Sequence, residues 1–159
     1  MKKLNVRNLL LSIIVCLSAG LIGSLFTFAA IPTWYAALTK PSFSPPNWIF
    51  GPVWTTLYIL MGIAMYLVWK KGTKKKSVRQ ALTLFLIHLG FNAGWSIVFF
   101  GLHSIFGGMV VIIILWGLIV AVIREFYRID RQAAYFLIPY LVWVSFAGVL
   151  NFSLLLLNQ

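Results

Sequence analysis

Acidic residues are nearly absent from this sequence. It contains two, Glu125 and Asp130, against 13 lysines and arginines, which gives a formal net charge of +11. Neither acid lies within a long apolar segment, which disfavours the proton-coupled exporters that need a carboxylate inside the membrane. Paired carboxylates and a nucleophile next to a base are missing as well, so the sequence offers no residues for hydrolytic chemistry.

Cysteine and metal-binding clusters are also scarce. The single cysteine, Cys16, lies in an apolar segment and cannot form an intrachain disulfide. The two histidines, His88 and His103, are fifteen residues apart with no cysteine nearby, a spacing that predicts no zinc site. No Gly-rich phosphate-binding loop occurs. The sequence therefore predicts no metal site and no bound cofactor.

Charged residues of either sign are few, because they make up 9% of the chain while 62% is hydrophobic. A soluble domain carries about 25% charged residues, and a small soluble protein has too much surface for the composition found here. Lipid must therefore surround most side chains. A high positive charge can indicate nucleic-acid binding, but the basic residues lie between the apolar segments, so we expect no nucleic-acid partner.

Five apolar segments are each long enough to cross a bilayer, which takes about 20 helical residues. Together with their short connections they fill the chain, so we predict an all-α membrane protein with a single domain, residues 1–159, built as a bundle of five transmembrane helices. The first segment could instead be a cleaved signal peptide, but it is longer than the ~7–15 apolar residues of such a signal, and we expect it to be retained. The predicted spans are residues 9–30, 48–69, 81–102, 105–123 and 133–157.

The basic residues gather on one side of the predicted membrane. With five spans, twelve of the 13 lysines and arginines share a side, and Lys40 in the first connection is the exception. Short basic connections stay in the cytoplasm, so we predict the N-terminus inside and the C-terminus outside. The short basic N-terminus is typical of a bacterial protein, and we expect a multi-pass protein of the bacterial plasma membrane. The twelve are Lys2, Lys3, Arg7, Lys70, Lys71, Lys74, Lys75, Lys76, Arg79, Arg124, Arg128 and Arg131.

The third segment has two contrasting faces at about 100° per residue. One carries Gly90 and Gly94, a spacing that lets two helix backbones approach closely. This face predicts either packing within the monomer or a homodimer contact. The other face carries His88, Asn92 and Trp95, and polar side chains at membrane depth usually face the bundle interior. We expect His88 to form hydrogen bonds with neighbouring helices, whereas Asn92 could do the same or offer its amide to a ligand.

Tryptophans occur both at the ends of the spans and inside them. Those at the ends, Trp34, Trp48 and Trp69, lie where interfacial anchors are common. Those inside are Trp54, Trp95 and Trp143, for which ordinary packing and a cavity wall are the alternatives. Trp54 shares a helix face with Tyr58, and Trp143 shares one with Ala147. If these faces converge, they form a cavity suited to a flat, largely apolar ligand.

Two connections are distinctive. The first contains four prolines, Pro32, Pro41, Pro45 and Pro46, and proline fixes φ and lacks a donor. We therefore expect an ordered segment that covers the outer end of the bundle. Within it, Lys40 could meet a ligand carboxylate or extend to lipid headgroups. The second connection, residues 70–79, is basic, and we expect it to be solvated and to touch anionic lipid.

Five short motifs follow one another in a specific order. They are Trp34-Tyr35-x-x-Leu38-x-Lys40-Pro41, Pro45-Pro46, Gly51-Pro52-x-Trp54-x-x-Leu57-Tyr58-x-x-Met61-Gly62-x-Ala64, Asn92-x-x-Trp95-Ser96 and Pro139-Tyr140-x-x-Trp143-x-x-Phe146-Ala147-x-x-Leu150-Asn151. In this order and spacing they resemble the translocator protein family, also called tryptophan-rich sensory proteins or peripheral-type benzodiazepine receptors (TspO/MBR). The similarity runs from the first span to near the C-terminus.

The resemblance implies a five-helix bundle, often a homodimer, with a ligand cavity under the first connection. Family members bind porphyrins, particularly protoporphyrin IX, and benzodiazepine-site ligands, and some bind sterols. We therefore predict an integral membrane receptor or sensor for porphyrins and similar flat apolar ligands. Its ligand-binding residues, from the resemblance together with the helix faces above, are Tyr35, Pro45, Trp54, Tyr58, Asn92, Trp95, Trp143 and Ala147.

Two other functions stay open. One is light- or oxygen-dependent degradation of protoporphyrin IX, in which Trp54 and Trp143 would be catalytic, since they match tryptophans linked to this activity in some bacterial members. The other is porphyrin transport, for which the sequence shows no intramembrane ion pathway and no inverted repeat. Sterol binding through the vertebrate pattern is disfavoured, because Phe152 stands in place of the tyrosine and no lysine or arginine follows it.

Overall fold

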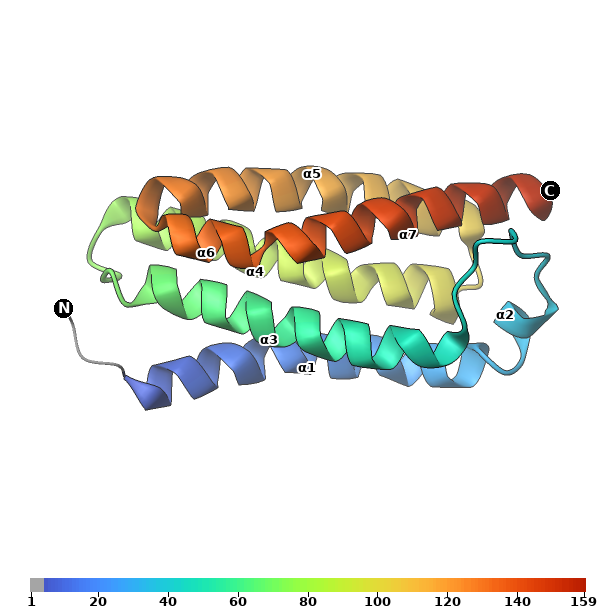
Figure 1. Cartoon of the computed structure of the whole chain (residues 1–159), viewed down its shortest axis with the longest axis horizontal. Helices are drawn as coiled ribbons and strands as arrows, with labels where there is room; N and C mark the ends of the chain where they lie inside the picture. The colour runs from blue at the N-terminus through green and yellow to red at the C-terminus, as the bar shows by residue number, and fades with distance from the viewer. Residues whose placement is uncertain (1–4) are drawn as a thin grey trace.

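The computed structural model describes residues 5–159, so Lys2 and Lys3, which contribute to the predicted charge segregation, lie outside the described residues. Within this range the chain is helical and contains no strand. Five long helices lie side by side along one axis (Figure 1). The elements are α1 (Val6–Ala30), α2 (Trp34–Ala37), η1 (Asn47–Ile49), α3 (Phe50–Trp69), α4 (Lys76–Ser96), η2 (Ile97–Gly101), α5 (Ile105–Ile129), α6 (Arg131–Phe136) and α7 (Ile138–Leu157).

The predicted all-α fold with five helices able to span a membrane is confirmed, and two of these helices extend well beyond the predicted spans. The third span begins at Lys76 instead of residue 81, and the fourth ends at Ile129 instead of residue 123. These helices extend beyond the apolar segments, because the backbone hydrogen bonding of a helix does not stop where the hydrocarbon ends. α5 ends where the Asp130 side chain accepts hydrogen bonds from the Gln132 and Ala133 amides, at 3.0 and 3.3 Å, and starts α6.

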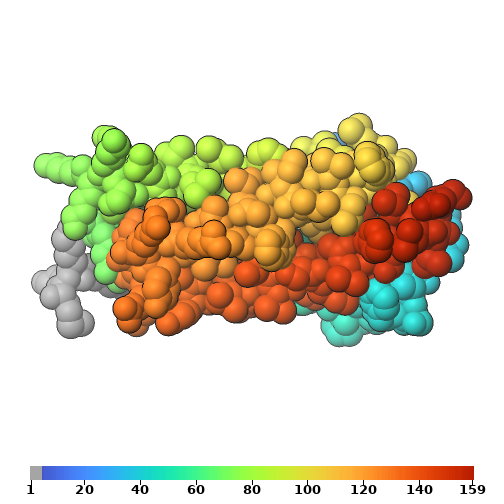
Figure 2. All heavy atoms as spheres, turned by 90° about the horizontal axis from the view of Figure 1, so that it is seen from above, coloured from blue at the N-terminus to red at the C-terminus, as the bar shows by residue number. Residues whose placement is uncertain are grey.

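The bundle has two different ends. The first connection, residues 31–49, lies beside the end of α7, and the α3–α4 connection lies at the opposite end (Figure 2). We call these the loop end and the basic end. α1 begins at the basic end and α7 finishes at the loop end (Figure 1), as an odd number of spans requires. That the basic end faces the cytoplasm stays a prediction from the charges.

α1 and α3 approach closely on the side of the basic end. A Cβ atom added at Gly62 of α3 would lie 2.6 Å from the Ile13 Cα of α1. This overlap involves a backbone atom, so a change of side-chain rotamer cannot relieve it. One turn and more toward the loop end, a Cβ at Gly20 would overlap the Tyr58 ring. Small residues let membrane helices pack through backbone contact, so these two glycines determine how near α1 lies to α3.

The glycine pair on α4 is placed differently. Nothing lies within 4 Å of a Cβ built at Gly90 or Gly94. Packing of this face within the monomer, one of the two predicted alternatives, is therefore wrong. The homodimer contact stays a prediction.

His88 lies on the opposite face of α4 and is 1% exposed. Its Nδ1 atom lies 2.5 Å from the Phe85 carbonyl oxygen one turn earlier. Its ring packs edge-on against Tyr140 of α7, with the ring centroids 5.7 Å apart. His88 is thus buried in the core, but the hydrogen bond that it forms within residues 5–159 is to its own helix. The predicted hydrogen bond to a neighbouring helix is therefore wrong, because the Phe85 carbonyl one turn earlier takes the ring nitrogen.

The contact at Gly62 predicts a matched pair of stabilities. Gly62→Ala places a methyl group against the α1 backbone and should lower the free energy of unfolding by about 1–3 kcal/mol, as overpacking does. Gly117→Ala on α5, where a Cβ meets nothing within 4 Å, should cause no loss. Thermal unfolding of the two variants in one detergent measures the difference, and equal melting temperatures would contradict the close approach.

Candidate functional site

A cavity of ≈ 590 Å³ lies in the half of the bundle nearest the loop end. Its wall comes from α1, α3, α4 with η2, and α7, and the first connection covers it. This volume falls in the range of ~300–1,000 Å³ that is usual for small-molecule sites. The cavity therefore lies where the sequence predicted a site, beneath the proline-rich connection.

Seven of the eight predicted ligand-binding residues line this one cavity. The eighth, Pro45, lies outside the wall. It follows a turn in which the Ser44 amide donates a hydrogen bond of 3.0 Å to the Pro41 carbonyl, and after this turn the chain reaches the cavity only at Asn47. Asn47 and Trp48 enter the wall from this segment instead. That the lining residues bind a ligand stays a prediction. The seven are Tyr35, Trp54, Tyr58, Asn92, Trp95, Trp143 and Ala147.

Asn92 joins three helices at the floor of the cavity. The Tyr58 hydroxyl donates a hydrogen bond of 2.6 Å to Asn92 Oδ1. Asn92 Nδ2 donates one of 3.0 Å to the Tyr140 hydroxyl. The amide thus bonds neighbouring helices, which was one of its two predicted roles. It keeps one N–H and one lone pair, so contact with a ligand stays a prediction.

Trp54 rests on the two tyrosines that this amide holds. Its ring stacks on Tyr58 with the centroids 5.6 Å apart, and meets the edge of Tyr140 at 6.2 Å. Aromatic pairs in these geometries contribute ~0.5–1.5 kcal/mol each beyond the area that they bury. The position of the Trp54 indole in the wall therefore depends on the hydrogen bonds of Asn92.

The other two interior tryptophans belong to separate aromatic stacks. Trp95 stacks on Phe99 at 5.0 Å, and Trp143 lies between Phe50 and Phe146, at 6.0 and 5.5 Å. The indole Nε1 atoms of both tryptophans are buried and have no hydrogen-bond partner within residues 5–159. The rings of both tryptophans line the wall, but their Nε1 atoms are buried within the packing and do not face the open space.

The first connection is fastened over the cavity by aromatic and amide contacts. Tyr35 packs against Phe100 at 5.7 Å, and burial raises the pKa of its hydroxyl, which therefore stays protonated at neutral pH. Trp34 stacks on His103 at 4.8 Å, and its role as an interfacial anchor stays a prediction. The Asn158 side chain pairs with the Thr39 backbone through two hydrogen bonds of 2.9 Å, which ties the connection to the end of α7.

Lys40 takes part in this cover. Its Nζ atom lies 4.8 Å from the centre of the Tyr35 ring and donates to the Ala36 and Leu38 carbonyls, at 3.3 Å each. Neither predicted role, pairing with a carboxylate or reaching lipid headgroups, is needed to explain this position. The ammonium group of Lys40 donates to backbone carbonyls of the turn that precedes Pro41.

The cavity is not fully enclosed, and part of its wall on α1 and η1 reaches the surface of the bundle. Three of its wall residues are strongly exposed on the outside of the bundle: Leu21 is 68%, Phe28 77% and Trp48 74% exposed. In a bilayer these side chains contact lipid. Acyl chains therefore border the cavity, and an apolar molecule dissolved in the membrane lies next to its opening.

The contribution of α1 escaped the sequence analysis. This helix supplies seven wall residues, none of them tryptophan, histidine or asparagine. Their only sequence signal is the run of small side chains at Gly20, Gly23 and Ser24, which keeps the wall thin. The seven are Leu17, Gly20, Leu21, Gly23, Ser24, Thr27 and Phe28.

Known proteins match the chain over nearly its whole length. The profile of the TspO/MBR family covers residues 12–157. The Tryptophan-rich protein TspO of Chlorobaculum tepidum is 46% identical over 153 residues, which is 96% of this chain and 97% of that protein. Its counterpart of the same name in Archaeoglobus fulgidus is 44% identical over 98% of this chain and 99% of its own. The human Translocator protein is 39% identical over 82% of this chain and 78% of its own. The family resemblance seen in the motifs is thus confirmed.

Proposed function

Because the chain belongs to the TspO/MBR family, we propose that it is a receptor or sensor that binds porphyrins, protoporphyrin IX in particular, and similar flat apolar ligands in the cavity described above. The chain is a multi-pass membrane protein, so its ligand partitions between lipid and protein. The single observation that carries the proposal is the convergence of the Trp54, Trp95 and Trp143 side chains from three helices on one hollow.

The walls suit such a ligand in shape and chemistry. Indole and phenyl faces stack on an extended π-system, and the cavity is large enough for a molecule of that class. The Asn92 amide in the same wall keeps one N–H beyond the hydrogen bond that it donates to Tyr140, so an acceptor atom of the ligand could meet it there.

Replacing one indole should weaken porphyrin binding. Trp143→Phe keeps an aromatic ring but removes part of the stacking surface, so the dissociation constant for protoporphyrin IX should rise about threefold to tenfold. Quenching of the remaining tryptophan fluorescence during a titration measures it. Asn92→Ala should also weaken binding, since the Tyr58 and Tyr140 hydroxyls that hold Trp54 lose their partner.

A matched control is Trp116→Phe. Trp116 lies on α5, is 45% exposed, and donates to Ser145 outside the cavity. This variant makes the same chemical change and should bind protoporphyrin IX as the unaltered chain does. If Trp143→Phe and Trp116→Phe bind equally well, the site assignment is wrong.

Degradation of the bound porphyrin is a second candidate, favoured because both Trp54 and Trp143 line the wall. In this reaction the photoexcited porphyrin would be oxidised and molecular oxygen would be reduced, and an indole in the wall could relay an electron between them and return to its starting oxidation state. Under light and air the protein should bleach protoporphyrin IX faster than denatured protein or detergent does, and Trp54→Phe should remove the excess. Equal bleaching in all samples would reject catalysis and leave the binding proposal intact.

The open face of α4 supports a homodimer through Gly90 and Gly94 of two copies. Both positions have empty space above them, and this spacing allows backbone contact across a helix pair.

Gly90→Leu should therefore convert a dimer to a monomer without loss of folding, because no atom of the same copy is displaced. Gly117→Leu, at an equally open position of α5, should leave the dimer unchanged. Light scattering during size-exclusion chromatography measures the mass, and a dimer that survives Gly90→Leu would exclude this face.

A further inference from the structure

The basic end of the bundle carries cations that its acids do not neutralise. Asp130 pairs with Lys71 at 2.8 Å, and Glu125 pairs with Arg128 at 2.8 Å. Partial burial opposes ionisation of Asp130, but the hydrogen bond from Lys71 and those from the backbone amides outweigh it and lower its pKa. Both acids of the chain are thus engaged. Lys74, Lys75, Lys76 and Arg79 are exposed and form no ion pair within residues 5–159.

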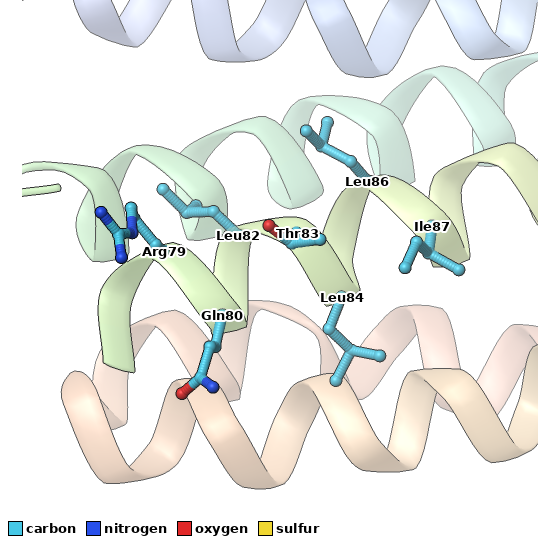
Figure 3. A pocket seen from close by; sticks show the side chains of 7 residues that line it. All are labelled: Arg79, Gln80, Leu82, Thr83, Leu84, Leu86 and Ile87. Carbon is cyan, nitrogen blue, oxygen red and sulfur yellow. The ribbon is translucent and has the colours of Figure 1, made fainter. Parts of the chain in front are cut away.

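A groove of ≈ 520 Å³ starts at the last of these cations and runs along α4 (Figure 3). Two rows of side chains border it, with Arg79, Leu82 and Leu86 on one side and Gln80, Leu84 and Ile87 on the other. Rows at three- and four-residue spacing are parallel ridges on a helix. The short Thr83 side chain lies between them, so the hollow continues for about two turns.

The groove changes character along its length. Arg79 and Gln80 form its head, next to the exposed lysines of the α3–α4 connection, and Leu86 and Ile87 form its tail, 48% and 49% exposed to the lipid region. A cation followed by an apolar track is the complement of an anionic headgroup followed by an acyl chain. The guanidinium binds phosphate oxygens bidentately, whereas the single charge of an ammonium would position a headgroup less narrowly.

We propose that this groove is a binding site for an anionic phospholipid, with the phosphate at Arg79 and one acyl chain along the track between Leu86 and Ile87. The site lies at the opposite end of the bundle from the ligand cavity and does not depend on the porphyrin proposal. Its head at Arg79 is about three turns from Gly90, where helices that cross at a glycine pair by ~40° have diverged. Its tail at Leu86 and Ile87 lies within about one turn of Gly90 on the same helix face, so the acyl chain would border a second copy packed there.

The test compares two charge removals on the same side of the membrane. The full chain in an uncharged detergent is titrated with phosphatidylglycerol or phosphatidylcholine of identical acyl chains, and the rise in melting temperature gives the apparent affinity for each. Arg79→Gln should weaken the affinity for phosphatidylglycerol about fivefold, the effect of one basic residue at a charged surface. Arg131→Gln, which removes an equally exposed cation that lies over Tyr127 away from the groove, should leave it unchanged.

A second variant tests the track separately from the charge. Thr83→Phe fills the space between the two rows, keeps every cation, and should also weaken the affinity for phosphatidylglycerol. Equal weakening by Arg79→Gln and Arg131→Gln would show diffuse attraction and overturn the site. Full stabilisation by glycerol 3-phosphate would show a small-anion site, and an altered oligomeric mass in Thr83→Phe with unchanged lipid affinity would assign the groove to a second copy. Either result would also overturn the proposal.

Discussion

The arrangement of helices in the bundle interior depends on the side-chain amide of Asn92. In lipid, helices gain little by hiding apolar surface from one another, so association rests on close packing and on hydrogen bonds between helices. Asn92 provides two such bonds at once, to Tyr58 on α3 and to Tyr140 on α7, and it is 3% exposed. The two tyrosine rings then support Trp54. One polar side chain thus couples the relative positions of three helices to the shape of the cavity wall.

The cavity exists because packing is uneven along the bundle. Near the basic end, α1 touches the backbone of α3 at Gly62, and stacked rings such as Phe85 and Phe126, 5.5 Å apart, fill the centre. Near the loop end, the same helices are separated by large aromatic side chains that belong to separate stacks and leave space between them. The first connection covers this space from above, and part of the wall on α1 and η1 reaches the surface of the bundle.

Several features could be predicted from particular residues. The five spans follow from apolar runs that lipid requires to be helical, and the convergence of Trp54, Asn92 and Trp143 follows from their spacing and from the family motifs. The position of Pro45 could not be predicted, because a turn between Pro41 and Ser44 decides where the chain enters the wall. The helix ends at Lys76 and Ile129 were missed because hydropathy records where lipid ends, while backbone hydrogen bonding decides where a helix ends.

The sequence by itself determined that lipid surrounds most of this protein, how many spans it has, where its charges gather and to which family it belongs. Each of these depends on composition or on order along the chain. The tertiary structure alone decided that Gly62 is a contact and Gly90 is not, although both are glycines within spans. It also decided that α1 forms a wall of the cavity and that Pro45 lies outside this wall. The reason is physical: periodicity tells which residues share a helix face, but only the packing of one helix on another determines what that face meets.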